Sequence, residues 1–291
     1  MGRRQVNNIA VAFVILLPTV YGWGIDGHYA VCAIAQSRLS DSAAAAVTDL
    51  LGGPDAQLAD HCDWADQVKF RYHWSSPLHY INTPDSLCTY DYNRDCKDKK
   101  GVRGRCVAGA INNYTSQLMR YGSSRPSPYN LTQALLFLSH FMGDIHQPLH
   151  VGFVSDEGGN TIDVTWYRRK DVLHHVWDGD IIETEEKRFY DKTVGEMIDD
   201  LQANITSEWA ELVDGWESCS DNDGPPCTDT YATESIEAAC DWAYKDVSEG
   251  SVLSDPYFKT RGPIVNLRLA QAGVRLAATL NTIFSGTSNQ I

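Results

Sequence analysis

The sequence predicts a mainly α-helical protein, folded as a single helical domain that carries one short β-hairpin. Apolar residues recur at helical spacing along most of the chain, and only one stretch is rich in β-forming residues. No internal repeat, low-complexity block or linker divides the chain. With 291 residues, of which 43% are hydrophobic, the chain can bury a large core, and this composition excludes a disordered or fibrous protein.

The chain begins with a segment that has the layout of a secretory signal peptide. Two arginines precede an apolar run at residues 9–17, and small or polar residues follow up to Gly22. The alternative is a membrane anchor, but the run is well short of the roughly 20 residues that a spanning helix needs. We therefore expect residues 1–22 to be removed in the secretory pathway, so that the mature chain begins at Trp23 and reaches the extracellular space or the vacuole.

Helices are expected on both sides of the β-forming stretch. One stripe of apolar residues predicts a helix over residues 29–39, and another predicts a helix over residues 264–276. Residues 83–105 and 218–230 combine cysteine with Pro, Gly, Asp and Asn, which is typical of loops held by disulfides. The polar residues 285–291 are expected to form a frayed tail that is open to trimming.

The predicted hairpin lies within residues 159–175. Residues 161–167 are mainly β-branched or aromatic, and a charged segment at residues 168–171 follows them directly. We interpret this charged segment as the turn between the two strands.

The charge of the chain restricts the ways in which it can bind a polyanion. It has 24 Lys and Arg against 38 Asp and Glu, a formal net charge of −14, and removal of residues 1–22 would take away two further arginines. This balance excludes a broad basic surface that holds nucleic acid by counterion release. If the protein acts on nucleic acid, the positive charge must be supplied locally.

Cysteines and glycosylation sequons agree with a secretory route. The eight cysteines are an even set without a close C-x-x-C pair, so disulfides are their expected state, although spacing alone leaves 105 possible pairings. Asn113, Asn130 and Asn204 each begin an Asn-X-Thr sequon without a central proline, and we expect them to be glycosylated at the surface.

The first candidate metal ligands lie within residues 137–150. His140 and Asp144 are four residues apart, so on a helix their side chains project from one face and can hold one metal ion. Pro148 would break or kink the helix and turn His150 away from that face.

A second His/Asp pair and three further residues extend this set. His174 and Asp178 repeat the four-residue spacing, and His28, Asp66 and His79 are also candidates. Each alone has an ordinary alternative, because a histidine in an apolar helix is usually a hydrogen-bonded core residue and a His/Asp pair is usually a surface contact. Together they form a nitrogen and oxygen donor set that suits zinc better than an iron–sulfur cluster.

The order of these motifs resembles the zinc-dependent single-strand nucleases of plants and fungi, among them the plant bifunctional (type I) nucleases. The resemblance covers the whole mature chain and depends on five motifs: Trp23-Gly-x-x-Gly-His28, Trp64-Ala-Asp66, Leu78-His79-Tyr80, His140-x3-Asp144-x5-His150 and His174-x3-Asp178. It implies a phospholipase C/single-strand-nuclease-like fold with a trinuclear zinc cleft, formed by residues 23–284 and active as a monomer.

The resemblance also implies which residues hold each of the three zinc ions. Trp23 would bind the first ion through its free α-amino nitrogen and its carbonyl oxygen. His28 and Asp144 would be the other ligands of the first ion. The second ion would be bound by Asp66, His79, His140 and Asp144, with Asp144 bridging the first two ions. The third ion would be bound by His150, His174 and Asp178. Three Zn²⁺ ions held by three aspartates would leave a local charge of about +3, which answers the need for positive charge in an acidic chain.

Further roles follow from the same resemblance. Asp66 would orient or deprotonate the attacking water. Lys69 would stabilise the transition state, or it would be only a solvated surface lysine. Tyr80 would stack on a base of the substrate, and Asn82 would contact the same base. The alternative role for Tyr80 is packing in the core. Many relatives have aspartate at the position of Asn82, so the base preference can differ.

The resemblance pairs the cysteines as Cys32 with Cys62, Cys88 with Cys240, Cys96 with Cys106 and Cys219 with Cys227. It predicts an endonuclease that cleaves single-stranded RNA and DNA to 5′-phosphorylated products and acts on 3′-nucleotides. Two alternatives remain open. One is a zinc phospholipase C, which typically has Glu at the position of Asp178, and the other is a non-catalytic secreted glycoprotein with structural zinc.

Overall fold

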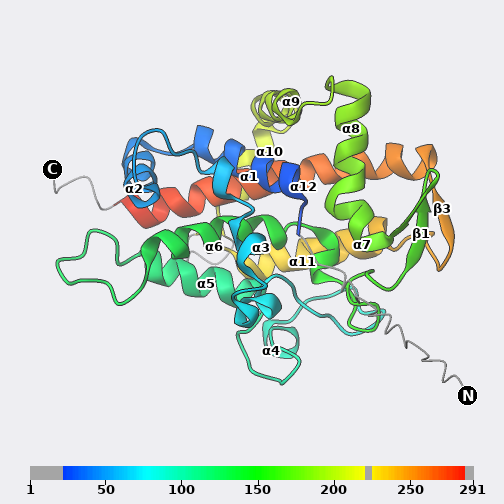
Figure 1. The fold of residues 1–291 in the computed structure, drawn as a ribbon, viewed down its shortest axis with the longest axis horizontal. Helices are drawn as coiled ribbons and strands as arrows, with labels where there is room; N and C mark the ends of the chain where they lie inside the picture. The colour runs from blue at the N-terminus through cyan, green and yellow to red at the C-terminus, as the bar shows by residue number, and fades with distance from the viewer. Residues whose placement is uncertain (1–21, 220–224, 286–291) are drawn as a thin grey trace, which may run out of the picture.

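The computed structural model describes residues 22–219 and 225–285 (Figure 1). The predicted signal peptide, except Gly22, and the predicted tail, except Ser285, lie outside the described residues. Within the described residues, every helix is too short or too polar to cross a membrane.

The described part of the chain is mainly helical, as the sequence predicts. Its α-helices are α1 Ile25–Ser37, α2 Asp41–Leu51, α3 Trp64–Val68, α4 Tyr92–Asp95, α5 Val107–Leu118, α6 Leu131–Asp144, α7 Leu173–His175, α8 Ile181–Phe189, α9 Val194–Thr206, α10 Ala210–Glu217, α11 Thr228–Ala238 and α12 Asp255–Phe284. Short helical turns of other types are η1 Ala59–His61, η2 His73–Leu78, η3 Pro148–Val151, η4 Val176–Asp180 and η5 Ala239–Ala243. The strands are β1 Asp163–Trp166, β2 Arg169–Val172 and β3 Ser251–Leu253.

The long helix α12 runs across the molecule, with α1 packed along it and with α5 and α6 forming an adjacent pair (Figure 1). Gly273 of α12 allows this close approach, because a Cβ atom there would lie 2.5 Å from Cγ2 of Ile34 in α1. Large side chains such as Phe137, Phe141 and Trp177 are fully buried between these helices and their neighbours. The core therefore fixes α1 against α6, the two helices that carry the first candidate ligands.

The two helix predictions are correct in position and differ in extent. The stripe at residues 29–39 lies mostly in α1, which ends at Ser37. The stripe at residues 264–276 is the middle of α12, whose 30 residues continue through an internal proline, Pro263. The predicted loop at residues 83–105 contains the short helix α4.

The predicted hairpin is present, but its turn is earlier than expected. β1 pairs antiparallel with β2, with Trp166 opposite Arg169, so Tyr167 and Arg168 form the turn and the remaining charged residues belong to β2. Tyr167 has a φ of 54°, the left-handed conformation that this tight turn needs. The charged side chains fit β2 because it is an edge strand, on which Arg169 and Lys170 are exposed and Asp171 forms an ion pair with Arg169.

The sheet also has a third strand, β3, which pairs parallel with β1. Three residues are too few to show an alternating pattern in the sequence, which explains why β3 was not predicted.

Four disulfides connect the loops to this helical body, with the same pairings that the resemblance implies: Cys32–Cys62, Cys88–Cys240, Cys96–Cys106 and Cys219–Cys227. The second of these joins residues 152 positions apart in the sequence and ties the loop before α4 to η5. The asparagines of the three sequons are accessible, with Asn113 and Asn130 exposed and Asn204 half-buried.

Candidate metal centre

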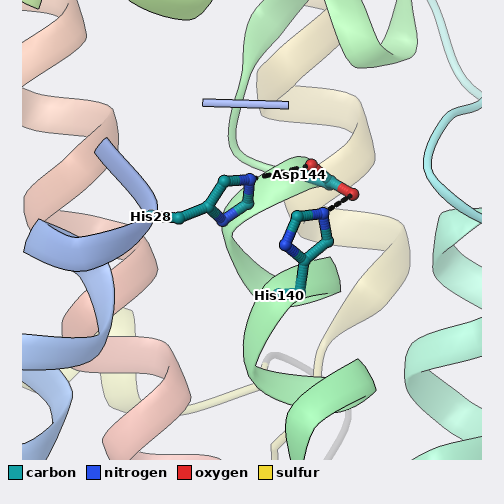
Figure 2. A group of neighbouring side chains, drawn as sticks. All are labelled: His28, His140 and Asp144. Carbon is teal, nitrogen blue, oxygen red and sulfur yellow. Dashed lines mark ion pairs between the residues drawn. The ribbon is translucent and has the colours of Figure 1, made fainter. Parts of the chain in front are cut away.

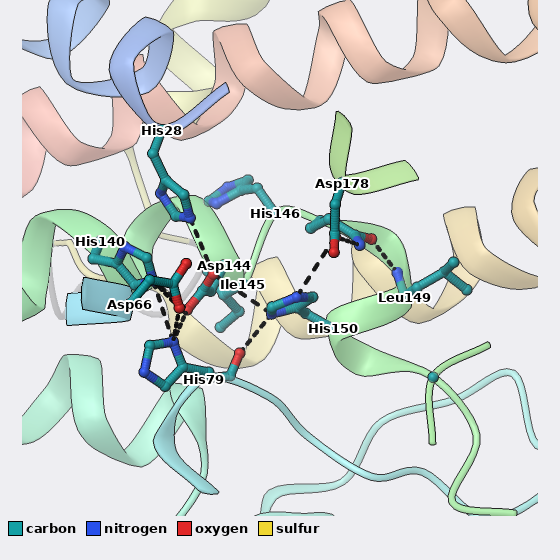
Figure 3. A network of polar contacts seen from close by, with 12 residues as sticks. His28, Asp66, His79, His140, Asp144, Ile145, His146, Leu149, His150 and Asp178 are labelled. Carbon is teal, nitrogen blue, oxygen red and sulfur yellow. Dashed lines mark hydrogen bonds and ion pairs between the residues drawn. The ribbon is translucent and has the colours of Figure 1, made fainter. Parts of the chain in front are cut away.

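The eight predicted ligand side chains come from seven segments and converge on one buried region. Figure 3 shows seven of them, all except His174. His140 and Asp144 project from the last two turns of α6, one turn apart, as their spacing predicts. Helix α6 ends at Asp144, and Pro148 begins the separate turn η3, which carries His150. The other ligands are His28 on α1, Asp66 on α3, His79 after η2, His174 on α7 and Asp178 on η4.

These side chains form three groups whose ligand atoms lie within 4.8 Å of one another: His28 with His140 and Asp144, Asp66 with His79 and His140, and His150 with His174 and Asp178. Asp144 lies at the centre of the arrangement. Its carboxylate oxygens are 3.4 Å from Nε2 of His28 and 3.2 Å from Nε2 of His140 (Figure 2). They are also 3.0 Å from Nδ1 of His79 (Figure 3). Oδ1 of Asp144 also lies 3.5 Å from Nδ1 of His150, so this carboxylate contacts histidines of all three groups.

Backbone carbonyls set the orientation of three of the imidazoles. Nδ1 of His140 donates to the carbonyl of Cys62 over 2.8 Å, and Nδ1 of His174 donates to the carbonyl of Gly158 over 2.6 Å. Nδ1 of His150 likewise donates to the carbonyl of His79 over 2.7 Å. A carbonyl oxygen can only accept, so Nδ1 carries a proton in each ring, and whenever the ring is neutral its Nε2 offers a lone pair.

The lone pairs of these rings face carboxylate oxygens, and this arrangement fits a bound cation. Nε2 of His174 lies 3.4 Å from Oδ2 of Asp178, and within the described residues neither it nor Nε2 of His28 has a hydrogen-bond partner. Two acceptors that face each other in a buried site repel unless a proton or a metal ion lies between them. The donor set of imidazole nitrogens and carboxylate oxygens is one that divalent metal ions accept.

The pKa values of the buried groups lead to the same conclusion. Burial lowers the pKa of His28 to about 4 and that of His174 to about 3, so both rings are in the neutral form that binds metal. Burial also raises the pKa of Asp178 well above its usual range. For His140, burial alone would lower the pKa, but the carboxylates of Asp144 and Asp66 outweigh it and raise the pKa to about 9. A bound metal ion would balance the negative charge of Asp144 and Asp66, so that the imidazole of His140 could stay neutral.

The beginning of the described chain lies directly beside the first group. A Cβ atom at Gly22 would overlap Oδ1 of Asp144 and would lie 2.7 Å from Nε2 of His28. The peptide bond between Gly22 and Trp23 is thus next to these two ligands, and the indole of Trp23 is fully buried.

The other predicted residues lie close to the same centre. Nζ of Lys69 is 3.2 Å from Oδ1 of Asp66, and only 15% of its side chain is exposed, so it is not a freely solvated surface lysine. Tyr80, Asn82 and His174 line an open cleft of about 1090 Å³. Tyr80 is half-buried in the wall of this cleft.

Several supporting residues were not predicted from the sequence. Nε2 of Gln147 donates to Oδ1 of Asp178 over 2.6 Å and so orients that carboxylate. A Cβ atom at Gly143 would lie 2.8 Å from Nδ1 of His28, so a larger residue there would displace the ring. Gln147 precedes Pro148 within the ligand-rich segment, and this position is the only signal that the sequence offers for it.

A fourth group of potential ligands, also not predicted, consists of Asp171, His175 and Asp180. It is more exposed than the other three, and Arg169 forms ion pairs with both of its aspartates. The chain therefore already supplies a cation to this group.

Comparison with known proteins gives one consistent result. The chain matches the S1/P1 Nuclease family over residues 23–285. It is 60% identical to Endonuclease 2 of Arabidopsis thaliana over 95% of both chains, and 54% identical to Endonuclease 4 of the same species over 90% of this chain and 89% of the relative. It is 34% identical to Nuclease S1 of Aspergillus oryzae over 96% of this chain and 98% of the relative.

Proposed function

Because the chain belongs to the S1/P1 nuclease family, we propose that it is a zinc-dependent endonuclease that hydrolyses single-stranded RNA and DNA to 5′-phosphorylated products and also acts on 3′-nucleotides. The observation that carries this proposal is the convergence of eight buried His and Asp side chains into three groups beside an open cleft. The nuclease class follows from the family, whereas three zinc ions and the individual residue roles are part of the proposal.

Each group of side chains would hold one zinc ion. Trp23 would join His28 and Asp144 on the first ion through its α-amino nitrogen and carbonyl oxygen, and His140 would bind the second ion. The position of residue 22 against Asp144 and His28 supports this role for the amino end. Bound zinc supplies Lewis-acid stabilisation for the phosphate that is attacked and for the oxygen that leaves. An amide nitrogen cannot replace an amine as a ligand, so removal of residues 1–22 would be an activation step.

The chain's own residues would act on the substrate around this centre. Asp66 would orient the attacking water and accept its proton, and Lys69 beside it would stabilise the negative charge of the transition state. Tyr80 would stack on an unpaired base and Asn82 would hydrogen-bond to the base edge, since both line the cleft. Stacking requires a base that is already free, which explains a preference for single strands.

We also propose the boundaries and processing of the chain. The nuclease domain would comprise residues 23–284, and residues 285–291 would be open to trimming. The four disulfides are compatible with passage through the secretory pathway. We expect a monomer in the extracellular space or the vacuole, with glycans on Asn113, Asn130 and Asn204.

The test uses the processed, secreted protein. We expect three zinc ions per chain by metal analysis, cleavage of single-stranded RNA and DNA, loss of cleavage on chelation and recovery when zinc is added. Hydrolysis of phosphatidylcholine without nuclease activity would instead identify a zinc phospholipase C. Unchanged nuclease activity in fully metal-free protein would overturn the metal-dependent mechanism.

A further inference from the structure

A strongly basic loop interrupts this acidic protein. Residues 96–106, here called the basic loop, contain five Lys or Arg residues and a single acidic residue, Asp98, in a chain with a net charge of −14. The Cys96–Cys106 disulfide closes the loop, with the two Cα atoms 5.0 Å apart. The five basic residues are Lys97, Lys99, Lys100, Arg103 and Arg105.

The acidic residue of the loop is fully engaged inside the loop itself. Oδ1 of Asp98 accepts hydrogen bonds from the backbone N–H groups of Lys100 and Val102, at 2.9 and 3.0 Å. Its other oxygen forms an ion pair with Arg105 at 3.1 Å. Asp98 thus stabilises the loop conformation and neutralises only one of the five basic side chains.

The remaining basic side chains of the loop are exposed and available to a ligand. Lys97, Lys100 and Arg103 all lie at the surface. Lys99 forms an ion pair with Glu157 at 3.3 Å, but 73% of the lysine side chain and 57% of the glutamate side chain are exposed. Exposed pairs of this kind contribute only about 0–1 kcal/mol, so an incoming anion can replace the glutamate.

The basic loop also forms part of the wall of the candidate substrate cleft. Lys97, Lys99 and Gly101 line the same cleft as Tyr80 and His174. The loop is fixed relative to Tyr80, because the backbone N–H of Val107, directly after the loop, donates to the carbonyl of Tyr80 over 3.2 Å. The volume of about 1090 Å³ is slightly above the roughly 300–1,000 Å³ that small-molecule pockets occupy, which leaves room for more than one nucleotide.

We propose that the basic loop binds the backbone phosphates of nucleotides that flank the cleaved bond, and so holds a single-stranded polynucleotide along the cleft. This inference rests on the proposed nuclease function and adds a second phosphate-binding region to it. Lys97 and Lys99 would contact the strand, and the phosphate would take the place of Glu157 at Lys99. A substrate too short to reach the loop would gain nothing from it.

The test compares long and short substrates for the variant Lys97→Gln/Lys99→Gln. The matched control is Lys187→Gln/Lys192→Gln, which also removes two exposed lysines. Lys187, in the last turn of α8, forms an exposed pair with Glu183, and Lys192 lies just after this helix. We expect the ratio of kcat/KM for a 20-nucleotide strand to that for a dinucleotide to fall by about 5- to 20-fold in the loop variant, an effect of about 1–2 kcal/mol. The control should keep the ratio of the unmodified protein.

Salt dependence gives a second readout that a purely structural role of the loop would not change. Each lost phosphate contact to a single strand reduces the slope of log affinity against log salt by about 0.7, so we expect a reduction of up to about 1.4 for the double variant. Lys97→Arg/Lys99→Arg should restore the ratio and the slope. Neutral methylphosphonate linkages in the flanking positions should remove the difference between the unmodified protein and the loop variant.

The outcomes separate this inference from the function on which it rests. If the zinc-loaded, unmodified protein cleaves no single-stranded nucleic acid, the proposed function fails. If it cleaves normally and the loop variant keeps both the ratio and the salt slope, the function stands and the role of the basic loop is refuted.

Discussion

Two regions of one cleft offer positive charge to a nucleic acid in different ways. The metal centre is built from buried carboxylates and mostly neutral imidazoles, so its positive charge has to come from bound ions. The basic loop is exposed, and its positive charge belongs to its own lysine and arginine side chains. An acidic protein can therefore hold a polyanion without a basic surface over the whole molecule.

This difference in burial predicts a difference in behaviour. Buried charges are screened weakly by salt and depend on one another, whereas exposed lysines act almost independently and are screened within about 8–10 Å at ordinary ionic strength. We expect changes in the metal centre to abolish activity at any salt concentration. Changes in the basic loop should give graded effects that disappear as salt is raised.

The largest effect is expected from Asp144→Asn. Asp144 contacts imidazoles of all three groups, those of His28, His79, His140 and His150, so losing its charge affects the whole centre. We expect the protein to lose more than one zinc ion and the rate of cleavage to fall by at least about 10³-fold. Metal analysis and single-strand digestion measure both quantities. The control is Asp171→Asn, which contacts a histidine outside the three groups, and equal effects of the two variants would contradict the shared role of Asp144.

A smaller effect is expected when one extra residue precedes Trp23. Any side chain at position 22 would overlap Oδ1 of Asp144, and the Trp23 nitrogen would be an amide and no longer an amine. We expect one of three zinc ions to be lost and the rate to fall by about 10²-fold. The matched control is the same protein cleaved to begin at Trp23. Full zinc content and full activity in the extended protein would refute a ligand role for the amino end.

Lys69→Met should separate catalytic charge from metal binding. Lys69 is largely buried beside Asp66, so its charge is screened less than that of Lys97 or Lys99. We expect kcat to fall by about 10- to 100-fold with zinc retained, for long and short substrates alike and at every salt concentration. Lys69→Arg should recover part of the rate. A loss confined to long strands would instead make Lys69 part of the same strand-binding surface as the basic loop.

The sequence predicts the local part of this architecture well. His140 with Asp144 and His174 with Asp178 follow from helical spacing, because residues four positions apart share one face. His28, Asp66 and His79 come from other segments, and their grouping with the two pairs came from the resemblance. The reason is that short-range spacing carries no information about which segments meet in the fold.

The supporting contacts could not be predicted, because they depend on tertiary structure. The carbonyl of Cys62 reaches His140 from a segment 78 residues away in the sequence, and Gln147 reaches Asp178 across 31 residues. Backbone carbonyls have no sequence signature at all, since every residue has one. The turn of the hairpin differs from the prediction for a related reason: Arg169 and Lys170 are as suitable for an exposed edge strand as for a turn.

The smallest effect concerns a buried carboxylate, Glu185, that forms no ion pair with any of the described residues. Glu185 on α8 is 6% exposed, accepts one long hydrogen bond from Asn266 at 3.3 Å, and within the described residues its Oε2 has no hydrogen-bond partner. Burial raises its pKa from 4.5 to about 7. Between these values the folded protein binds more protons than the unfolded chain, so the free energy of unfolding falls as pH rises.

Glu185→Gln should remove this loss of stability because the amide carries no charge to desolvate. We expect the variant to be more stable than the unmodified protein by about 2–3 kcal/mol at pH 8, with the gain shrinking towards pH 5, as measured by denaturant unfolding of the zinc-loaded protein. The control is Glu208→Gln, an exposed position that should leave the pH dependence unchanged. Asp144 and Glu185 can then be compared directly. Replacing Asp144, which is paired with imidazoles, should lower zinc content and activity, whereas replacing Glu185 should raise the free energy of unfolding. If both glutamate variants showed the same pH dependence, burial of Glu185 would not be what makes its charge unfavourable.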